Sequence, residues 1–132
     1  MQINLVKSNE DDKVGYQNIP ISSENINGIP DSICTQMSLD HVVDYITEDD
    51  FAAVLKKIRH RGEVEIRGVD APEVFRKVSI GLLEFSHSLP LLGGKVRLTS
   101  MGSVRSVLEN MGFVTEIAAL HESFYYIKAK RP

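Results

Sequence analysis

Cysteine is almost absent from this sequence, since Cys34 is the only one among its 132 residues. A single cysteine excludes an internal disulfide and an all-cysteine metal site. The stretch around it is apolar, so we expect a buried structural thiol rather than a nucleophile.

Long apolar runs are also missing. No run approaches the ~20 residues that a membrane-spanning helix needs, and residues 1–4 carry no basic segment of the kind that opens a secretory leader. We therefore expect a soluble, cytoplasmic protein that does not contact a membrane. Hydrophobic content of 42% and charged content of 25% are ordinary for a globular chain, and the length predicts one domain over residues 1–132.

Basic side chains are scarce in the first part of the chain. Residues 1–50 hold two of them against ten acidic ones, whereas residues 51–132 hold 13 basic and eight acidic side chains. The acidic part argues against a grip on a phosphate backbone. A basic cluster at residues 56–61 is interpreted as the solvated end of a helix that Gly62 terminates, so nucleic acid is not expected as a partner.

Motifs for metal binding or catalysis are lacking as well. The four histidines include no pair at i, i+4 spacing, and we expect no metal site. Asp40, His41 and Asp44 follow a predicted central strand, where a role in proton transfer stays open. Helix capping by Asp40 and an exposed His41 are the favoured interpretation, so no catalytic residue is assigned.

The apolar pattern that is present predicts strands alternating with helices. Thr47, Asp70 and either Ser100 or Ser103 are expected to cap helices. The helix after Asp70 should bury its residues 74, 75, 78 and 82. Residues 22–31 are interpreted as loop and residues 86–94 as a loop or a broken helix. Strands are expected over residues 3–6, 15–21, 32–39, 63–69, 113–120 and 124–130, and a further strand is expected to start at Lys95 before the last helix.

This order of elements favours an α/β domain with a largely parallel sheet. The last two strands are joined by a tight turn and must form one antiparallel pair. Pro20 cannot donate a hydrogen bond to a sheet, so the strand over residues 15–21 should lie at an edge.

Several segments, taken in order, resemble one branch of the class I S-adenosylmethionine-dependent methyltransferases. Ile3-Asn4-Leu5 is similar to the first strand of that branch, and Gly15-Tyr16-Gln17-Asn18-Ile19 to its second segment. His41 to Ile46 resembles a helix start, and His60 to Asp70 resembles the run into the fourth family strand. The helix that ends at Met111-Gly112-Phe113 and runs into two strands is how such proteins commonly finish. The resemblance implies a Rossmann-like methyltransferase sandwich with strand order 2-1-4-5-7-6 in family labels, a reduced N-terminal half and no third family strand.

The departures from that family fall where S-adenosylmethionine should bind. Val6, Lys7 and Ser8 replace the glycines that let the family backbone pass beneath the cofactor, and only glycine lacks the Cβ that obstructs this approach. Pro20 stands where the family has an acidic residue for the ribose hydroxyls. The resemblance thus implies vestigial cofactor positions at Leu5, Val6, Lys7, Ser8, Pro20 and Gln36.

These departures lead to three functional hypotheses. The first is a degenerate, non-catalytic methyltransferase-like domain that has lost S-adenosylmethionine and acts through a protein partner or as a homo-oligomer, for example through the sheet edge exposed by the missing strand. The second is an active S-adenosylmethionine-dependent methyltransferase with an atypical cofactor loop. The third is a small-molecule or nucleotide binding module that uses the old cleft, lined by Lys7, Ser8 and Gln36.

Overall fold

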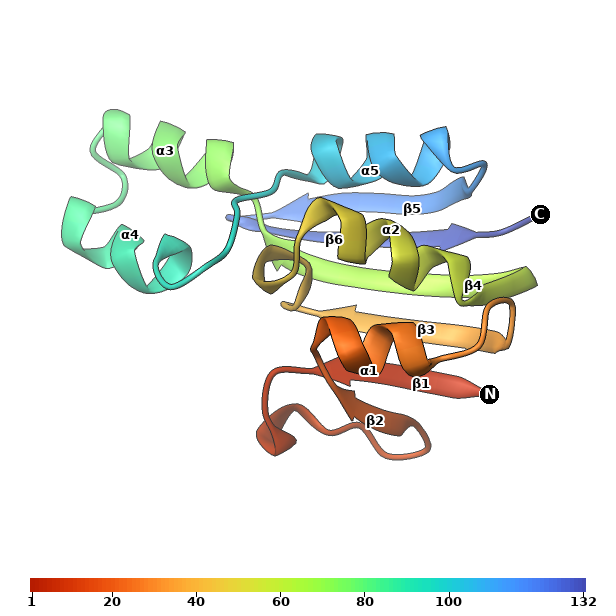
Figure 1. Cartoon of the computed structure of the whole chain (residues 1–132). Helices are drawn as coiled ribbons and strands as arrows, with labels where there is room; N and C mark the ends of the chain where they lie inside the picture. The colour runs from red at the N-terminus through yellow and green to blue at the C-terminus, as the bar shows by residue number, and fades with distance from the viewer.

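A single six-stranded sheet organises the chain in the computed structural model, which describes residues 1–132 (Figure 1). The strand order is β2-β1-β3-β4-β6-β5. The pairs among β1 to β4 are parallel, whereas β6 pairs antiparallel with both β4 and β5. The strands are β1 (Gln2–Val6), β2 (Gln17–Pro20), β3 (Cys34–Asp40), β4 (Ile58–Val69), β5 (Val114–His121) and β6 (Phe124–Lys130).

This sheet confirms the predicted architecture. If β3 to β6 are taken as the fourth to seventh family strands, the order is the expected 2-1-4-5-7-6, and no strand lies outside β2. The strand expected from Lys95 does not form, so β4 corresponds to the fifth family strand and not to the fourth. The edge position of β2 agrees with Pro20 at its end. No helix is both long and apolar enough to cross a bilayer.

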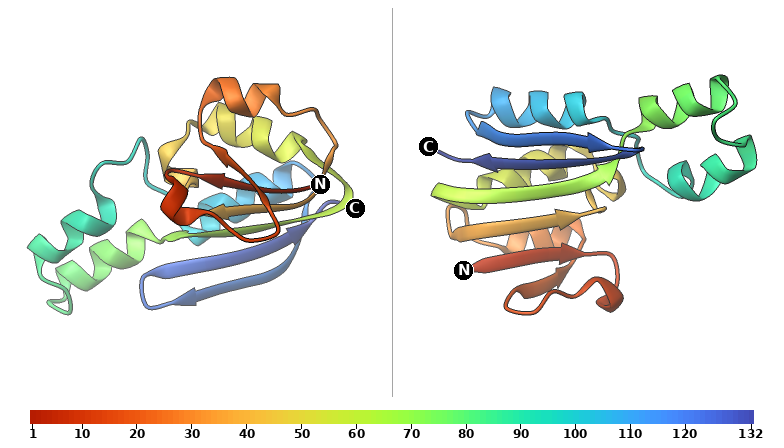
Figure 2. Two further views of the ribbon diagram at one scale, coloured as in Figure 1. Left: turned by 90° about the horizontal axis from the view of Figure 1, so that it is seen from below. Right: turned by 180° about the vertical axis from the view of Figure 1, so that it is seen from behind.

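Three of the five helices cover the same face of the sheet. Figures 1 and 2 show α1, α2 and α5 side by side on that face. The core lies between them and the strands, where Phe51 and Leu55 of α2 and Leu108 of α5 are fully buried. The helices are α1 (Ser23–Gly28), α2 (Glu48–Lys56), α3 (Ala71–Ser79), α4 (Phe85–Leu92) and α5 (Met101–Asn110), with single 3-10 turns η1 (Asn9–Asp11) and η2 (Val43–Tyr45).

The opposite face of the sheet carries no helix (Figure 2). Parallel strands that are buried on both faces consist of continuous apolar runs, but here polar and apolar residues alternate. In β4, Val64 and Ile66 are fully buried, while the intervening Glu63 and Glu65 are half-buried. The alternation explains how a mostly parallel sheet can leave one face to water.

The loop between β1 and β2 covers part of the polar face. The side-chain amide of Asn4 donates to the backbone oxygen of Asp11 at 3.1 Å and to the Asn18 side chain at 2.9 Å. The Asn18 side chain in turn accepts a hydrogen bond from the backbone N–H of Lys13 at 2.8 Å. These bonds satisfy polar groups that the sheet would otherwise bury unpaired.

The helix caps are as predicted. Thr47 accepts a hydrogen bond from the backbone N–H of Asp50 at 3.1 Å, and Ser100 forms a reciprocal capping box with Ser103. Asp70 accepts from the N–H of Glu73 and also from the N–H of Met101, each at 3.2 Å, so one carboxylate holds the starts of α3 and α5 together.

Two predicted boundaries are wrong. Residues 22–31 contain the short helix α1, which Ser22 caps through the N–H of Asn25. The basic cluster is not a helix end, because α2 stops at Lys56 and β4 begins at Ile58, whose side chain is fully buried in the core. Gly62 therefore lies within β4, and a register shift between Cys34 and Gln36 accompanies the exposure of residues 59–61.

The predicted buried face of α3 is also largely wrong. Val74 is buried, but Phe75 is 51% exposed and Leu82, beyond the helix end, is 69% exposed. The reason is visible in Figure 1, where α3 and α4 extend past the end of the sheet as a helical hairpin. We call residues 71–92 the arm. Its second helix, α4, runs unbroken with Pro90 inside it, where a loop or a broken helix was predicted.

Candidate functional site

The carboxyl ends of β1 and β3 form the point at which ligands bind in open α/β sheets. The chain leaves β1 toward β2 on one side and leaves β3 toward β4 on the other, which makes the β1–β3 boundary the topological switch point. The residues that follow there are Val6 and Lys7 from β1, and Asp40 and His41 from β3.

Lys7 lies at this boundary and contacts η2. Its ammonium lies 3.9 Å from the ring centroid of Tyr45 in η2, a cation–π contact. Val6 before it is buried, and its backbone oxygen accepts from the N–H of Ile21 at 2.9 Å. Ser8 after it is exposed, and its side chain makes no capping bond to η1.

The end of β2 is occupied by the start of α1. The side-chain amide of Asn25 donates to the backbone oxygen of Pro20 at 2.8 Å. Proline offers no acceptor side chain, and its carbonyl is already bonded. Leu5, two residues before Lys7, is buried in the core and packs rather than lining a cleft.

Gln36 lies at the other end of the sheet. It pairs in register with Gln2 at the start of β1, four residues from Val6, or about 13 Å along the strand. Its side chain accepts from the Gln2 amide at 2.9 Å. The structure therefore brings Val6, Lys7, Ser8 and Pro20 to one edge and does not bring Gln36 to them.

An acidic cavity of about 310 Å³ opens beside the switch point on the helix-free face. No apolar side chain lines it. Its walls are Asn4, Glu10, Asp11, Asp12, Lys13, Ser38 and Asp40.

Asp40 does not cap a helix as predicted. The N-cap position of η2 is Val42, so Asp40 is not a helix cap and stays exposed. The exposed His41 agrees with its prediction. It adopts a φ of 57°, and its ring meets the Phe124 ring edge-on with centroids 6.0 Å apart.

A second cavity, of about 190 Å³, lies between η2, the ends of β4 and β6, and α4. A buried ion pair forms part of its wall: the Lys95 ammonium lies 2.7 Å from Oδ2 of Asp44, and both side chains are less than a tenth exposed. Asp44 was a candidate from sequence, but Lys95 was not. Its partner is 51 residues away, and no local pattern marks it.

The ion pair belongs to a buried polar network. The Thr99 hydroxyl donates to Oδ1 of Asp44 and lies 2.9 Å from the Tyr125 hydroxyl. Burial raises the pKa of Tyr125, which keeps this phenol protonated at neutral pH. The Tyr125 ring crosses Gly68 of the neighbouring strand, where a Cβ would lie 2.5 Å from its hydroxyl oxygen.

Solved structures of S-adenosylmethionine-dependent methyltransferases share this fold. One from Mesorhizobium loti superposes with a TM-score of 0.65 and 13% identity, over 98% of this chain and 80% of that one. One from Archaeoglobus fulgidus gives 0.61 and 11%, over 98% and 75%. One from Aquifex aeolicus gives 0.58 and 11%, over 90% and 56%.

The chain thus has a Rossmann-like α/β fold of the class I methyltransferase type, with helices on one face of the sheet. Identities this low establish the fold and leave the activity to be argued from the residues. No family model matches the sequence, and no curated protein matches it significantly.

Proposed function

We propose that this chain is a non-catalytic methyltransferase-like domain that associates with a second copy of itself through the arm. The observation that carries the proposal is the apolar surface of the arm. Five large apolar side chains there are at least half exposed: Phe75, Ile80, Leu82, Phe85 and Leu89.

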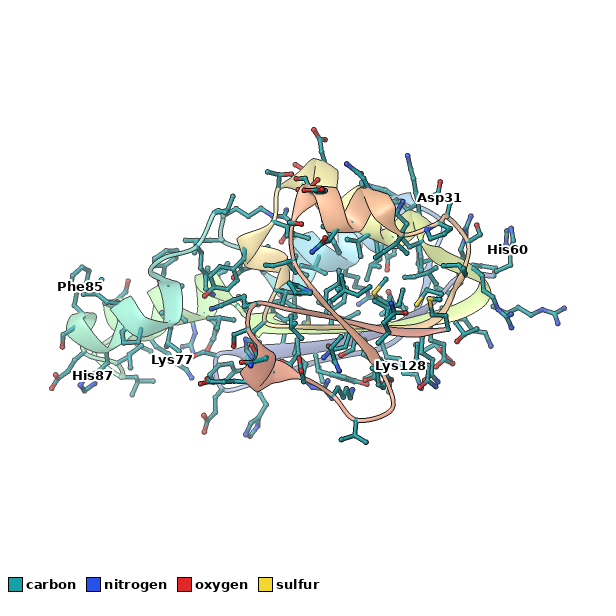
Figure 3. The ribbon with its side chains drawn as sticks, turned by 60° about the horizontal axis from the view of Figure 1, so that its bottom comes forward. Asp31, His60, Lys77, Phe85, His87 and Lys128 are labelled. Atoms are coloured by element: carbon teal, nitrogen blue, oxygen red, sulfur yellow. The ribbon has the colours of Figure 1, made fainter.

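The arm has little to bury these side chains against within its own chain. The helices α3 and α4 pack mainly against each other. Neither helix packs extensively against the sheet or against α1, α2 or α5. Figure 3 shows Phe85 projecting outward from the end of the molecule. Together the five side chains expose on the order of 500 Å² of apolar surface, close to the largest patches found on monomeric proteins.

A second copy is the occupant that the arm fits best. Two helical hairpins can pack as a four-helix layer with two-fold symmetry, in which each apolar surface covers the other. A standard interface buries about 800 Å² per partner, which the apolar surface and its polar rim approach. Charge suits this pairing too, since the arm carries both Lys77 and Glu84.

The residues at the switch point do not fit S-adenosylmethionine, which supports a non-catalytic role. Val6 and Lys7 stand where close backbone approach is needed, and Lys7 is held on Tyr45. Pro20 has no acceptor for ribose hydroxyls. The acidic cavity nearby lacks the apolar wall that an adenine ring requires.

Light scattering during size-exclusion chromatography tests the self-association. The wild-type chain is expected to elute with the mass of a dimer at tens of micromolar. A Leu82→Glu, Phe85→Glu double variant should be monomeric with an unchanged circular dichroism spectrum, because both side chains are mostly exposed. Val14→Glu is the matched control, since Val14 is fully exposed in the β1–β2 loop, away from the arm. A monomeric wild-type chain contradicts the proposal.

Calorimetric titration tests the cofactor part separately. S-adenosylmethionine and S-adenosylhomocysteine are expected to give no binding heat at millimolar ligand. Micromolar binding of either would refute the loss of the cofactor and favour the alternative of an active methyltransferase, whatever the oligomeric state.

A further inference from the structure

The cavity of about 190 Å³ beside the buried ion pair has features that the proposed self-association does not use. One part of its wall is apolar, formed by Val69, Leu91 and Phe124. A compact molecule with an apolar body fits these dimensions.

The polar part of the wall holds more hydrogen-bond donors than the protein itself uses. The Lys95 ammonium has three N–H donors and one hydrogen-bond partner, Asp44. Both Asp44 carboxylate oxygens are occupied, one by Lys95 and the other by Thr99. The hydrogen-bonding groups that remain unused at this buried position are therefore N–H donors of the positively charged Lys95 ammonium.

Two further residues with basic side chains, Arg67 and His41, line the cavity. Arg67 is 42% exposed, and its guanidinium lies over the Tyr126 ring, 4.6 Å from the centroid. Its nearest carboxylate, Glu65, is 3.8 Å away, beyond hydrogen-bond distance. His41 lines the same cavity. The charge balance of the lining favours an anion over a cation.

A buried ion pair is a poor stabiliser in itself, because desolvation offsets much of the Coulomb attraction. An apolar pair of similar volume would serve the fold equally well. Lys95 lies in a cavity wall and has unused N–H donors. Ligand binding by Lys95 would explain why a charged pair occupies this position.

We propose that this cavity binds a small organic anion, a carboxylate joined to a compact apolar group. The carboxylate accepts hydrogen bonds from Lys95 and Arg67, and the apolar group contacts Leu91 and Phe124. The binding requires neither S-adenosylmethionine nor a second copy of the chain, so it stands apart from the proposed self-association.

The test is an NMR titration of the full chain at pH 7 and constant ionic strength, in which binding is monitored by the amide chemical shifts. Benzoate is the probe, and its neutral and cationic analogues benzamide and benzamidine are the comparisons. Benzoate is expected to shift the amide signals of Gly68, Val69, Leu91 and Lys95 in a saturable manner. Benzamide should bind about tenfold more weakly, because its neutral carbonyl forms no ion pair with the basic side chains, and benzamidine should not bind.

Arg67→Gln should weaken benzoate binding about tenfold, since one charge-assisted contact is lost. Arg105→Gln is the matched control, because Arg105 is an exposed arginine of α5 whose partner is Glu109. It should leave the affinity unchanged. Circular dichroism verifies that both variants fold.

Three results overturn the proposal. Benzoate at millimolar concentration and in 20-fold excess over the protein could leave these four signals unshifted. Benzamide could bind as tightly as benzoate. Arg67→Gln could bind benzoate as the wild type does, which would place the anion elsewhere.

Discussion

Lys95→Met should be the most destabilising conservative change at the surface of the cavity. It removes one partner of the buried ion pair and leaves the Asp44 carboxylate, 6% exposed, with Thr99 as its only side-chain donor. Removal of one partner from such a pair costs about 3–5 kcal/mol, because the remaining charge is buried without compensation. Domains of this kind have a total free energy of unfolding of about 5–15 kcal/mol, so the loss should be plain.

The double variant Asp44→Leu, Lys95→Met tests the cause. It removes both charges and keeps side chains of similar volume, so no unpaired charge remains. Replacement of a buried pair by apolar side chains is often neutral or stabilising. We expect the double variant to recover most of the stability that the single variant loses.

Urea unfolding followed by far-ultraviolet circular dichroism measures both effects. With a slope of roughly 1–3 kcal/mol per molar urea, the single variant should unfold at a midpoint lower by about 2 M, with the slope unchanged. Lys128→Met is the matched control, since its carboxylate partner Glu63 is 3.7 Å away and both side chains are 30% exposed. This control should change the stability by less than about 1 kcal/mol. If Lys95→Met costs no more than the control, or if the double variant is as unstable as the single one, the reasoning is wrong.

Three further predictions concern positions outside this pair. Gly68→Ala should destabilise by about 1–3 kcal/mol in urea unfolding, because its Cβ would overlap the Tyr125 ring. Gly102→Ala lies in a helix and its Cβ would make only an ordinary contact, 3.9 Å from the Ser100 hydroxyl oxygen, so it should be neutral or stabilising by up to about 1 kcal/mol. Equal effects of the two substitutions would contradict the account. Asp31 accepts a hydrogen bond from the Lys57 ammonium, and this bond lowers the pKa of the Asp31 carboxyl group. The contribution of Asp31 to folding stability is therefore fully present above the ordinary pKa of 3.8 and is lost as pH falls through the lowered pKa. The unfolding temperature of Asp31→Asn should therefore be lower than that of the wild type at pH 7, and the two should converge in strong acid. The same difference in unfolding temperature at both pH values would contradict this account. Burial raises the pKa of Cys34, so its reaction with Ellman's reagent at pH 8 should be far slower than that of free cysteine until urea unfolds the chain.

The fold could be predicted because its signals are local. Thr47, Asp70 and Ser100 each bond to a backbone N–H three residues ahead, so their side chains and positions alone mark the helix starts. The alternation of strands and helices then favours a parallel sheet, and the turn at residues 121–123 requires the antiparallel pair. Pro20 marks an edge strand because it lacks an N–H.

The misplaced boundary before β4 shows where local signals stop. Ile58 continues the apolar spacing of α2 and was placed on that helix. In the structure it starts a strand, because the backbone oxygen of Lys57 accepts hydrogen bonds from the N–H groups of Ile33 and Cys34. A bond between residues more than 20 positions apart has no counterpart in the spacing of neighbouring residues.

The sequence by itself determined most of the elements and their caps, because these depend on side chains within a few residues of one another. The order of the sheet was implied by the resemblance to the methyltransferases. Only the tertiary structure decided which face of the sheet the helices cover, how far the arm extends beyond it, and which buried groups meet. Lys95 reaches Asp44 because the segment that returns from the arm donates two backbone hydrogen bonds, from Val96 and Arg97, to the Asp44 carbonyl. Such meetings depend on how the chain closes in three dimensions, and so the cavity became visible only in the folded molecule.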